Sequence, residues 1–189
     1  EQLVRRDLQL GGSAAPELGA MRFAPLKFTA DEAAAVARTL VGARVLTGAA
    51  ASEGTLKQAL APKVLHLATH GVFLEDLPAV DEGERGLDLA SSRRVENPLL
   101  RSGLALTGAN MRRTQGEDGI LTAMEVAGLD LWGTKLVVLS ACQTGVGEVR
   151  TGDGVYGLRR ALVLAGSESQ VMSLWSVADR ATRDLMVAY

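Results

Sequence analysis

A histidine and a cysteine stand directly after two short, almost wholly apolar runs of the sequence. The run 64–69 leads into His70-Gly71, and the run 136–141 leads into Cys142. Such runs are typical of strands that are covered on both faces of a parallel sheet, and sites in open α/β sheets lie outside the carboxyl ends of the strands. If the two strands are neighbours, about 4.8 Å apart, an imidazole and a thiol meet at that edge. A thiol beside an imidazole is a nucleophile with its general base.

Two plainer interpretations compete with this catalytic pair. A lone cysteine in an apolar run is more often an inert buried residue, and a histidine at a strand end is often satisfied by the backbone. Gly71 lets other backbone approach closely, and its N–H is of the kind that binds a developing oxyanion. Position alone favours the plainer interpretations over the catalytic pair.

Two other kinds of site have little support. His66 and His70 lie four residues apart on one strand, about 13 Å at roughly 3.3 Å per residue, whereas two ligands of one zinc ion each lie about 2 Å from it. His66 is therefore predicted to be a core or supporting residue. The glycines of 145–154 fit neither the dinucleotide fingerprint, because Arg150 stands where it needs glycine, nor a phosphate loop, so nucleotide binding is disfavoured.

Short β-branched runs alternate with longer helical stretches, which indicates an α/β domain. We expect strands at 44–47, 64–69, 104–106, 136–141 and 170–174, and helices at 52–60, 154–164 and 180–188. Capping boxes predict two further helix starts, Thr29 with Glu32 and Thr122 with Glu125. The segment 75–96 is rich in acidic residues, with proline and glycine, and is predicted to be a long acidic surface loop.

Composition narrows the class of protein. The chain has 189 residues, which fits one domain, and 20 Lys+Arg against 22 Asp+Glu, which argues against a dedicated nucleic-acid surface. No apolar stretch of about 18 residues is present, so no membrane span is expected. The single cysteine excludes an intrachain disulfide and a cysteine-based zinc cluster. Together with the lack of a visible leader, it suggests a reducing, cytoplasmic compartment.

Four segments closely resemble the CHAT domain, a caspase-like family associated with TPR repeats and grouped with the caspases, gingipains and separases. They are residues 64–71, 118–122, 136–145 and 174–179, and similarity continues through 152–161 and 164–166. The resemblance implies a three-layer α/β/α sandwich with a mostly parallel central sheet, formed by residues 1–189 as one domain. The family's final helices and strand are absent, and the chain stops within a helical pattern. We therefore expect the domain to be truncated at its C-terminus and inactive, or nearly so, in this form.

The resemblance also implies a function, that of a cysteine endopeptidase acting on a protein substrate. Cys142 would be the nucleophile, His70 the general base and acid, and the backbone amides of Gly71 and Cys142 the oxyanion hole. No metal or organic cofactor is implied, and TPR or other repeat domains are expected beside it in the parent chain. The alternative is a non-proteolytic CHAT module that binds or scaffolds partners.

The same resemblance suggests where a substrate would bind. In separase-like relatives, an acidic residue in a similar segment contributes to the pocket for a basic residue before the scissile bond. Asp179 is the matching position, beside Trp175 and Ser176, and a plainer interpretation makes Asp179 the N-cap of the following helix. Asp153 and Gln143 are weaker candidates for the substrate site.

Overall fold

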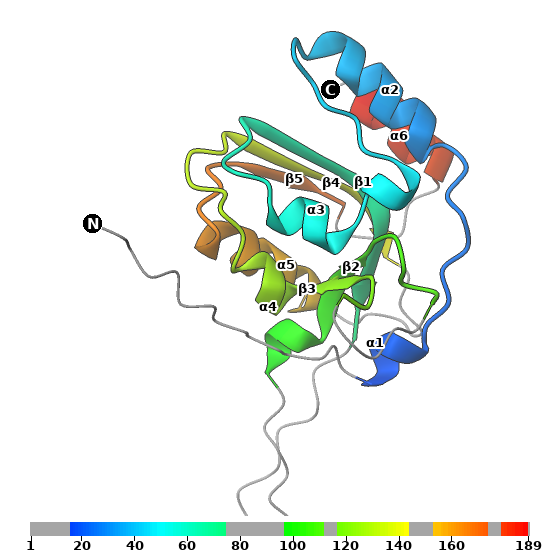
Figure 1. Ribbon diagram of the computed structural model, residues 1–189, viewed down its shortest axis with the longest axis vertical. Helices are drawn as coiled ribbons and strands as arrows, with labels where there is room; N and C mark the ends of the chain where they lie inside the picture. Colours follow the sequence, from blue (N-terminus) through cyan, green and yellow to red (C-terminus); the bar gives the residue numbers. More distant parts are fainter. Residues whose placement is uncertain (1–15, 75–96, 112–116, 144–152, 174–178, 189) are drawn as a thin grey trace, which may run out of the picture.

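The central feature of the computed structural model is a five-stranded sheet with the order β3-β2-β1-β4-β5 (Figure 1). The structure describes residues 16–74, 97–111, 117–143, 153–173 and 179–188. Along the chain the elements are α1 (Pro16–Ala20), α2 (Thr29–Thr39), α3 (Glu53–Lys57), β1 (Val64–Phe73), β2 (Ser102–Ala105), β3 (Ile120–Thr122), α4 (Ala123–Val126), β4 (Leu136–Gln143), α5 (Asp153–Leu164), β5 (Gln170–Met172) and α6 (Asp179–Ala188), with 3-10 turns at Gly48–Ala50 and Pro98–Leu100.

The sheet is mixed. Strand β4 pairs in parallel with both β1 and β5, whereas β2 is antiparallel to both β1 and β3. The parallel part contains the two apolar runs of the sequence, because a parallel strand is covered on both faces. The predicted α/β fold is confirmed, with a short antiparallel arm added beside β1.

Helices cover both faces of this sheet (Figure 1). On one face, Leu67 of β1 and Leu139 of β4 pack into the main core with Leu158 and Leu162 of α5. Leu67 is partly buried, whereas Leu139, Leu158 and Leu162 are buried, and fully burying a leucine contributes roughly 1.5–3 kcal/mol. Helices α2 and α6 lie on the opposite face and contact each other, β1 and β4. Since strand residues alternate between faces, the even-numbered positions of β1 and β4 belong to the α2 face.

One predicted capping box forms and the other does not. At the start of α4, the Thr122 amide donates to the Glu125 carboxylate at 2.8 Å, and the Glu125 amide donates to Thr122 Oγ1 at 3.3 Å. At α2 the helix begins at Thr29 as predicted, but the predicted box does not form, because Thr29 Oγ1 donates to the Leu26 carbonyl and no side chain caps the helix. Glu32 is buried and turns to His66 instead, since a buried carboxylate needs a hydrogen-bonding partner.

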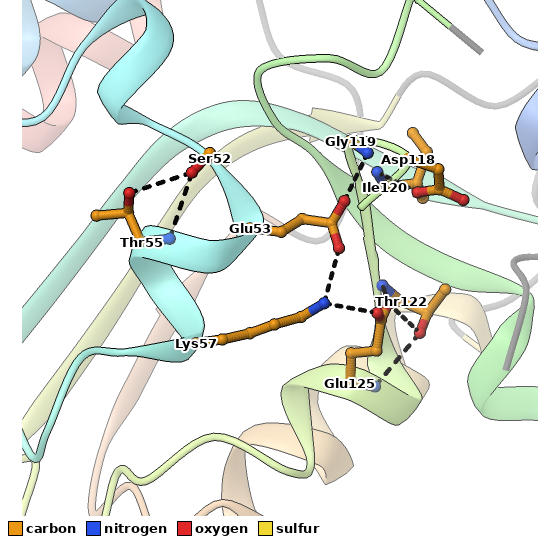
Figure 2. A network of polar contacts seen from close by, with 9 residues as sticks. All are labelled: Ser52, Glu53, Thr55, Lys57, Asp118, Gly119, Ile120, Thr122 and Glu125. Carbon is orange, nitrogen blue, oxygen red and sulfur yellow. Dashed lines mark hydrogen bonds and ion pairs between the residues drawn. The ribbon is translucent and has the colours of Figure 1, made fainter. Parts of the chain in front are cut away.

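A network of hydrogen bonds and ion pairs connects helix α3 to the rest of the domain (Figure 2). Glu53, 1% exposed, accepts from the Gly119 amide at 2.5 Å and from Lys57 Nζ at 2.9 Å. Lys57 also donates to Glu125 at 2.9 Å, so α3 is bonded both to Gly119, directly before β3, and to α4. Burial raises the pKa of Glu53. For Lys57, burial acts to lower the pKa, but the hydrogen bonds to Glu125 and Glu53 raise it above its ordinary value.

The predicted helices at 52–60, 154–164 and 180–188 correspond to α3, α5 and α6, with α3 ending at Lys57. The predicted strand at 44–47 is wrong, since these residues are exposed and pair with no strand in the described part of the chain. β-Branched composition favours a strand only where a neighbouring strand is available to pair. The segment 75–96 lies outside the described residues. Among the described helices, none is long and apolar enough to cross a lipid bilayer.

Candidate functional site

His70 and Cys142 are register partners on adjacent parallel strands. In the β1–β4 ladder, His70 stands opposite Cys142 and Gly71 stands opposite Gln143. Neighbouring strands lie about 4.8 Å apart, so the two backbone positions are directly side by side. Both strands continue past the apolar runs, which places His70 and Cys142 within the sheet near its carboxyl edge. Positions 70 and 142 are both even-numbered and belong to the α2 face.

The imidazole of His70 is held by a backbone carbonyl. Its Nε2 lies 2.6 Å from the carbonyl oxygen of Ala24. A carbonyl can only accept a hydrogen bond, so Nε2 carries the proton and Nδ1 of the neutral ring is the unprotonated nitrogen. Nδ1 is buried and has no hydrogen-bond partner among the described residues. The ring therefore keeps its basic nitrogen inside the fold and its N–H on Ala24.

Ala24 belongs to a segment that we call the strap, residues 21–28, which connects α1 to α2 across the His70 end of β1. Phe23 of the strap also contacts the histidine, with the two ring centroids 5.6 Å apart and the planes tilted by 38°. Such a tilted arrangement is a favourable one for aromatic rings. The strap thus contacts the imidazole twice, through a carbonyl and through a ring.

Strand β2 closes the other side of this position. Ala105 stands opposite His70 in the antiparallel β1–β2 ladder, and Thr69 Oγ1 donates to the Ala105 carbonyl. A Cβ built on Gly71 would lie 3.2 Å from the ring of Phe73, a tight contact that requires the ring to move. Close packing therefore favours glycine directly after His70.

His66 is committed to Glu32, as its predicted supporting role requires. Its Nε2 lies 2.7 Å from the Glu32 carboxylate, whose side chain is 1% exposed. The contact joins α2 to β1 on the face that also carries position 70. Sequence reasoning missed Glu32, because its spacing from Thr29 matched a capping box.

The structure describes only the backbone at several predicted site positions. Gln143 ends β4, Asp153 opens α5, and Asp179 opens α6, so α6 begins at Asp179 itself and not after it. Trp175 and Ser176 lie outside the described residues. The structure brings His70 and Cys142 together by register and leaves the predicted substrate residues without described side chains. It adds Ala24 and Phe23, which carry no motif that sequence analysis could have found.

Comparison with known protein families matches residues 2–189 to the CHAT domain. The chain belongs to the CHAT family. Its mixed sheet with helices agrees with the caspase-like fold of CHAT domains, whose family belongs to the caspase-like cysteine peptidase clan.

Among curated proteins, the human tetratricopeptide repeat protein 28 is 29% identical over 175 residues. The match covers 85% of this CHAT domain but only 7% of the human protein. The chain therefore spans only a small part of the length of this relative. No solved structure matches the chain significantly.

Proposed function

We propose that this CHAT domain is a cysteine endopeptidase whose catalytic residues are His70 and Cys142. The observation that carries the proposal is the register pairing of the two residues on adjacent strands, at one face of the sheet. The unpartnered, buried Nδ1 of His70 supports it, because a general base needs an unprotonated nitrogen.

The proposed reaction begins with proton transfer from the Cys142 thiol to Nδ1 of His70. The thiolate attacks the scissile carbonyl carbon, and the resulting oxyanion is stabilised by the backbone amides of Gly71 and Cys142. The imidazolium then gives its proton to the leaving amine, and the C–N bond breaks to leave a thioester on Cys142. His70 next accepts a proton from water, which attacks the thioester and releases the carboxylic acid and the thiol.

In this reaction Ala24 plays the part of an orienting group. Its carbonyl accepts from the Nε2–H of His70, which in the neutral ring leaves the lone pair on Nδ1. The same carbonyl stabilises the imidazolium that forms when Nδ1 takes the proton of the thiol, as the third member of a catalytic triad does.

We further propose that Asp179 contributes to a pocket for an Arg or Lys side chain before the scissile bond. Trp175, Ser176, Asp153 and Gln143 are its proposed neighbours. A guanidinium pairs with a carboxylate through two charge-assisted hydrogen bonds. An uncharged side chain would leave a desolvated carboxylate unpaired, which makes such a pocket selective.

The second candidate function is a non-proteolytic module that binds a partner beside repeat domains. The observation that favours it is the match to the human relative. The matching region is 7% of that protein, and its name records tetratricopeptide repeats. In that case the thiol of Cys142 would have no enhanced reactivity.

Labelling by a peptidyl acyloxymethyl ketone with Arg before the warhead distinguishes the two functions. Such a reagent alkylates an activated cysteine in a peptide-binding site. Cys142 is the one cysteine in the chain, so the mass added to the protein reports this residue alone. Labelling is a single covalent event and needs no turnover, so we expect it in the native protein even where hydrolysis of substrates is slow, and we expect its loss in His70→Ala. Equal labelling of native protein, His70→Ala and urea-unfolded protein would reject the peptidase and favour the binding module.

A further inference from the structure

The side chain of Asn110 holds both backbone groups of Phe23. Its Oδ1 accepts from the Phe23 amide at 3.0 Å, and its Nδ2 donates to the Phe23 carbonyl at 2.9 Å. The Arg22 guanidinium donates in turn to the backbone carbonyl of Asn110 at 3.0 Å. The strap is therefore fastened to Asn110 at two successive residues.

This attachment is immediately next to the contact with the proposed catalytic base. Phe23 precedes Ala24, whose carbonyl lies 2.6 Å from His70 Nε2, and the ring of Phe23 lies against the same imidazole. The Phe23 carbonyl that Asn110 holds lies in the peptide plane that ends at the Ala24 Cα, and the Ala24 carbonyl lies in the next plane. Only the two backbone dihedrals of Ala24 separate the two carbonyls, so fixing Phe23 restricts where the Ala24 carbonyl can lie.

Backbone hydrogen bonds fix the position of Asn110 itself. It lies in the turn that follows β2, where the Ala109 amide donates to the Leu106 carbonyl at 3.1 Å. Leu106 is held in turn by the carbonyl of Gly119 at 2.7 Å. One residue before Leu106, Ala105 pairs with His70. The contacts form a closed ring from His70 through β2 and Asn110 to the strap, and back to His70.

We propose that Asn110 is a positioning residue for His70. By holding Phe23 it keeps the Ala24 carbonyl on Nε2, which in the neutral ring leaves the lone pair on Nδ1. The effect of Asn110 on catalysis rests on the proposed function, whereas the effect of Asn110 on the position of the imidazole does not. Asn110 is exposed and acts through the strap, so it is not a catalytic residue.

Nuclear magnetic resonance of the ¹⁵N-labelled 189-residue chain tests the effect on the imidazole. We expect the Nε2 proton of His70 to be visible at neutral pH in the native protein, because its hydrogen bond to Ala24 slows exchange. In Asn110→Ala we expect its exchange with water to increase about tenfold or more. His66, whose Nε2 is held by Glu32, is the second histidine of the chain and serves as an internal control.

Alkylation of Cys142 by iodoacetamide tests the consequence for the thiol. Because a misplaced catalytic group loses much of its effect, we expect Asn110→Ala to react about tenfold more slowly at neutral pH. Asn97→Ala is the matched control, since Asn97 Oδ1 also accepts from a backbone amide, that of Leu99 in a 3-10 turn at 3.0 Å, but has no contact with the strap among the described hydrogen bonds. It should leave both measurements unchanged.

An unchanged His70 proton in Asn110→Ala overturns the proposal. Where His70→Ala slows alkylation, an exchanging proton together with an unchanged alkylation rate in Asn110→Ala overturns it as well. If His70→Ala does not slow alkylation, the proposed function fails, and the resonance experiment still decides the role of Asn110 at the imidazole. If Asn110→Ala does not fold, Asn110→Asp replaces it. That variant keeps an acceptor for the Phe23 amide and loses the donor to the Phe23 carbonyl, so the same two readouts apply.

Discussion

The carboxylate of Glu32 lies 2.7 Å from Nε2 of His66 and joins α2 to the central strand β1. Glu32 lies in the first turn of α2, directly after the strap. The strap is therefore fixed at both ends, by Asn110 on the α1 side and by the Glu32–His66 contact on the α2 side. Two histidines of β1 lie on the same face of the sheet. His66 contacts α2 through Glu32, and His70 contacts the strap through Ala24.

We expect Glu32→Ala to lower the free energy of unfolding by about 1–3 kcal/mol, because it leaves the imidazole of His66 without its partner. Asp31→Ala is the matched control, since Asp31 is an exposed acidic residue in the same helical turn. Both variants lose a favourable interaction with the helix dipole, which for Asp31 is worth less than about 1 kcal/mol. Urea unfolding measures the difference, and equal losses would show that the contact with His66 contributes nothing.

The raised pKa of Glu53 predicts a specific pH dependence of stability. Burial raises this pKa above its ordinary value of 4.5, so the folded state binds the proton more tightly than the unfolded state. The stability from this group is complete below 4.5 and is lost as the pH rises through the folded pKa. Relative to wild type, Glu53→Gln should therefore become more stable as the pH rises from about 4 to 7. A parallel pH dependence in the two proteins would contradict this assignment.

Lys57 compensates the buried charge of Glu53. Removing Lys57 should therefore lower the free energy of unfolding more than the partly exposed position of this residue suggests. We expect Lys57→Met to lower the free energy of unfolding by about 1–3 kcal/mol at neutral pH, because it leaves Glu53 without its cation. In the background of Glu53→Gln the same change should have a much smaller effect. A double-mutant cycle measures this coupling, and additive losses would mean that the two side chains are independent.

Gly119 should tolerate no side chain. Its φ is +88°, and a Cβ would lie 2.0 Å from the backbone nitrogen of Ala109. Gly133 has a similar φ of +94° with no atom within 4 Å of the Cβ position, so Gly133→Ala isolates the conformational cost of about 1–2 kcal/mol. We expect Gly119→Ala to lose clearly more than Gly133→Ala in thermal or urea unfolding. Equal losses would mean that the turn after β2 moves freely to make room.

The substrate preference can be tested by Asp179→Asn in active enzyme. We expect kcat/KM for substrates with Arg before the scissile bond to fall by about tenfold or more, because the charge-assisted pair is lost. Substrates with Leu at that position should be affected little. An equal fall for both substrates would mean that Asp179 supports the start of α6 and does not select the substrate.

The sequence contained enough information to predict that His70 and Cys142 are neighbours. Each follows an apolar run, such runs form central parallel strands, and their carboxyl ends meet at one edge of the sheet. The contact of Ala24 with His70 could not be predicted in this way. A backbone carbonyl has no side-chain signature, and 46 residues separate the two partners.

The errors at α2 and at residues 44–47 have a common physical cause. Local patterns predicted a capping box at Thr29 and a strand at 44–47, but tertiary contacts decide both. Glu32 finds a buried partner in His66, 34 residues away, and residues 44–47 find no strand to pair with among the described elements. The box at Thr122 and Glu125 forms as predicted, because its two partners are local and Glu125 can also accept from Lys57.

The pH dependence of Cys142 alkylation by iodoacetamide, compared between wild type and His70→Ala, tests the proposed dyad most directly. A free thiol ionises near about pH 8.5, and only the thiolate reacts. If His70 accepts the thiol proton, the native protein should react about tenfold or more faster than His70→Ala near pH 6.5, and the two rates should converge above about pH 9.5. Rate curves that coincide over the whole range would show that His70 does not activate Cys142, and would contradict the proposed function.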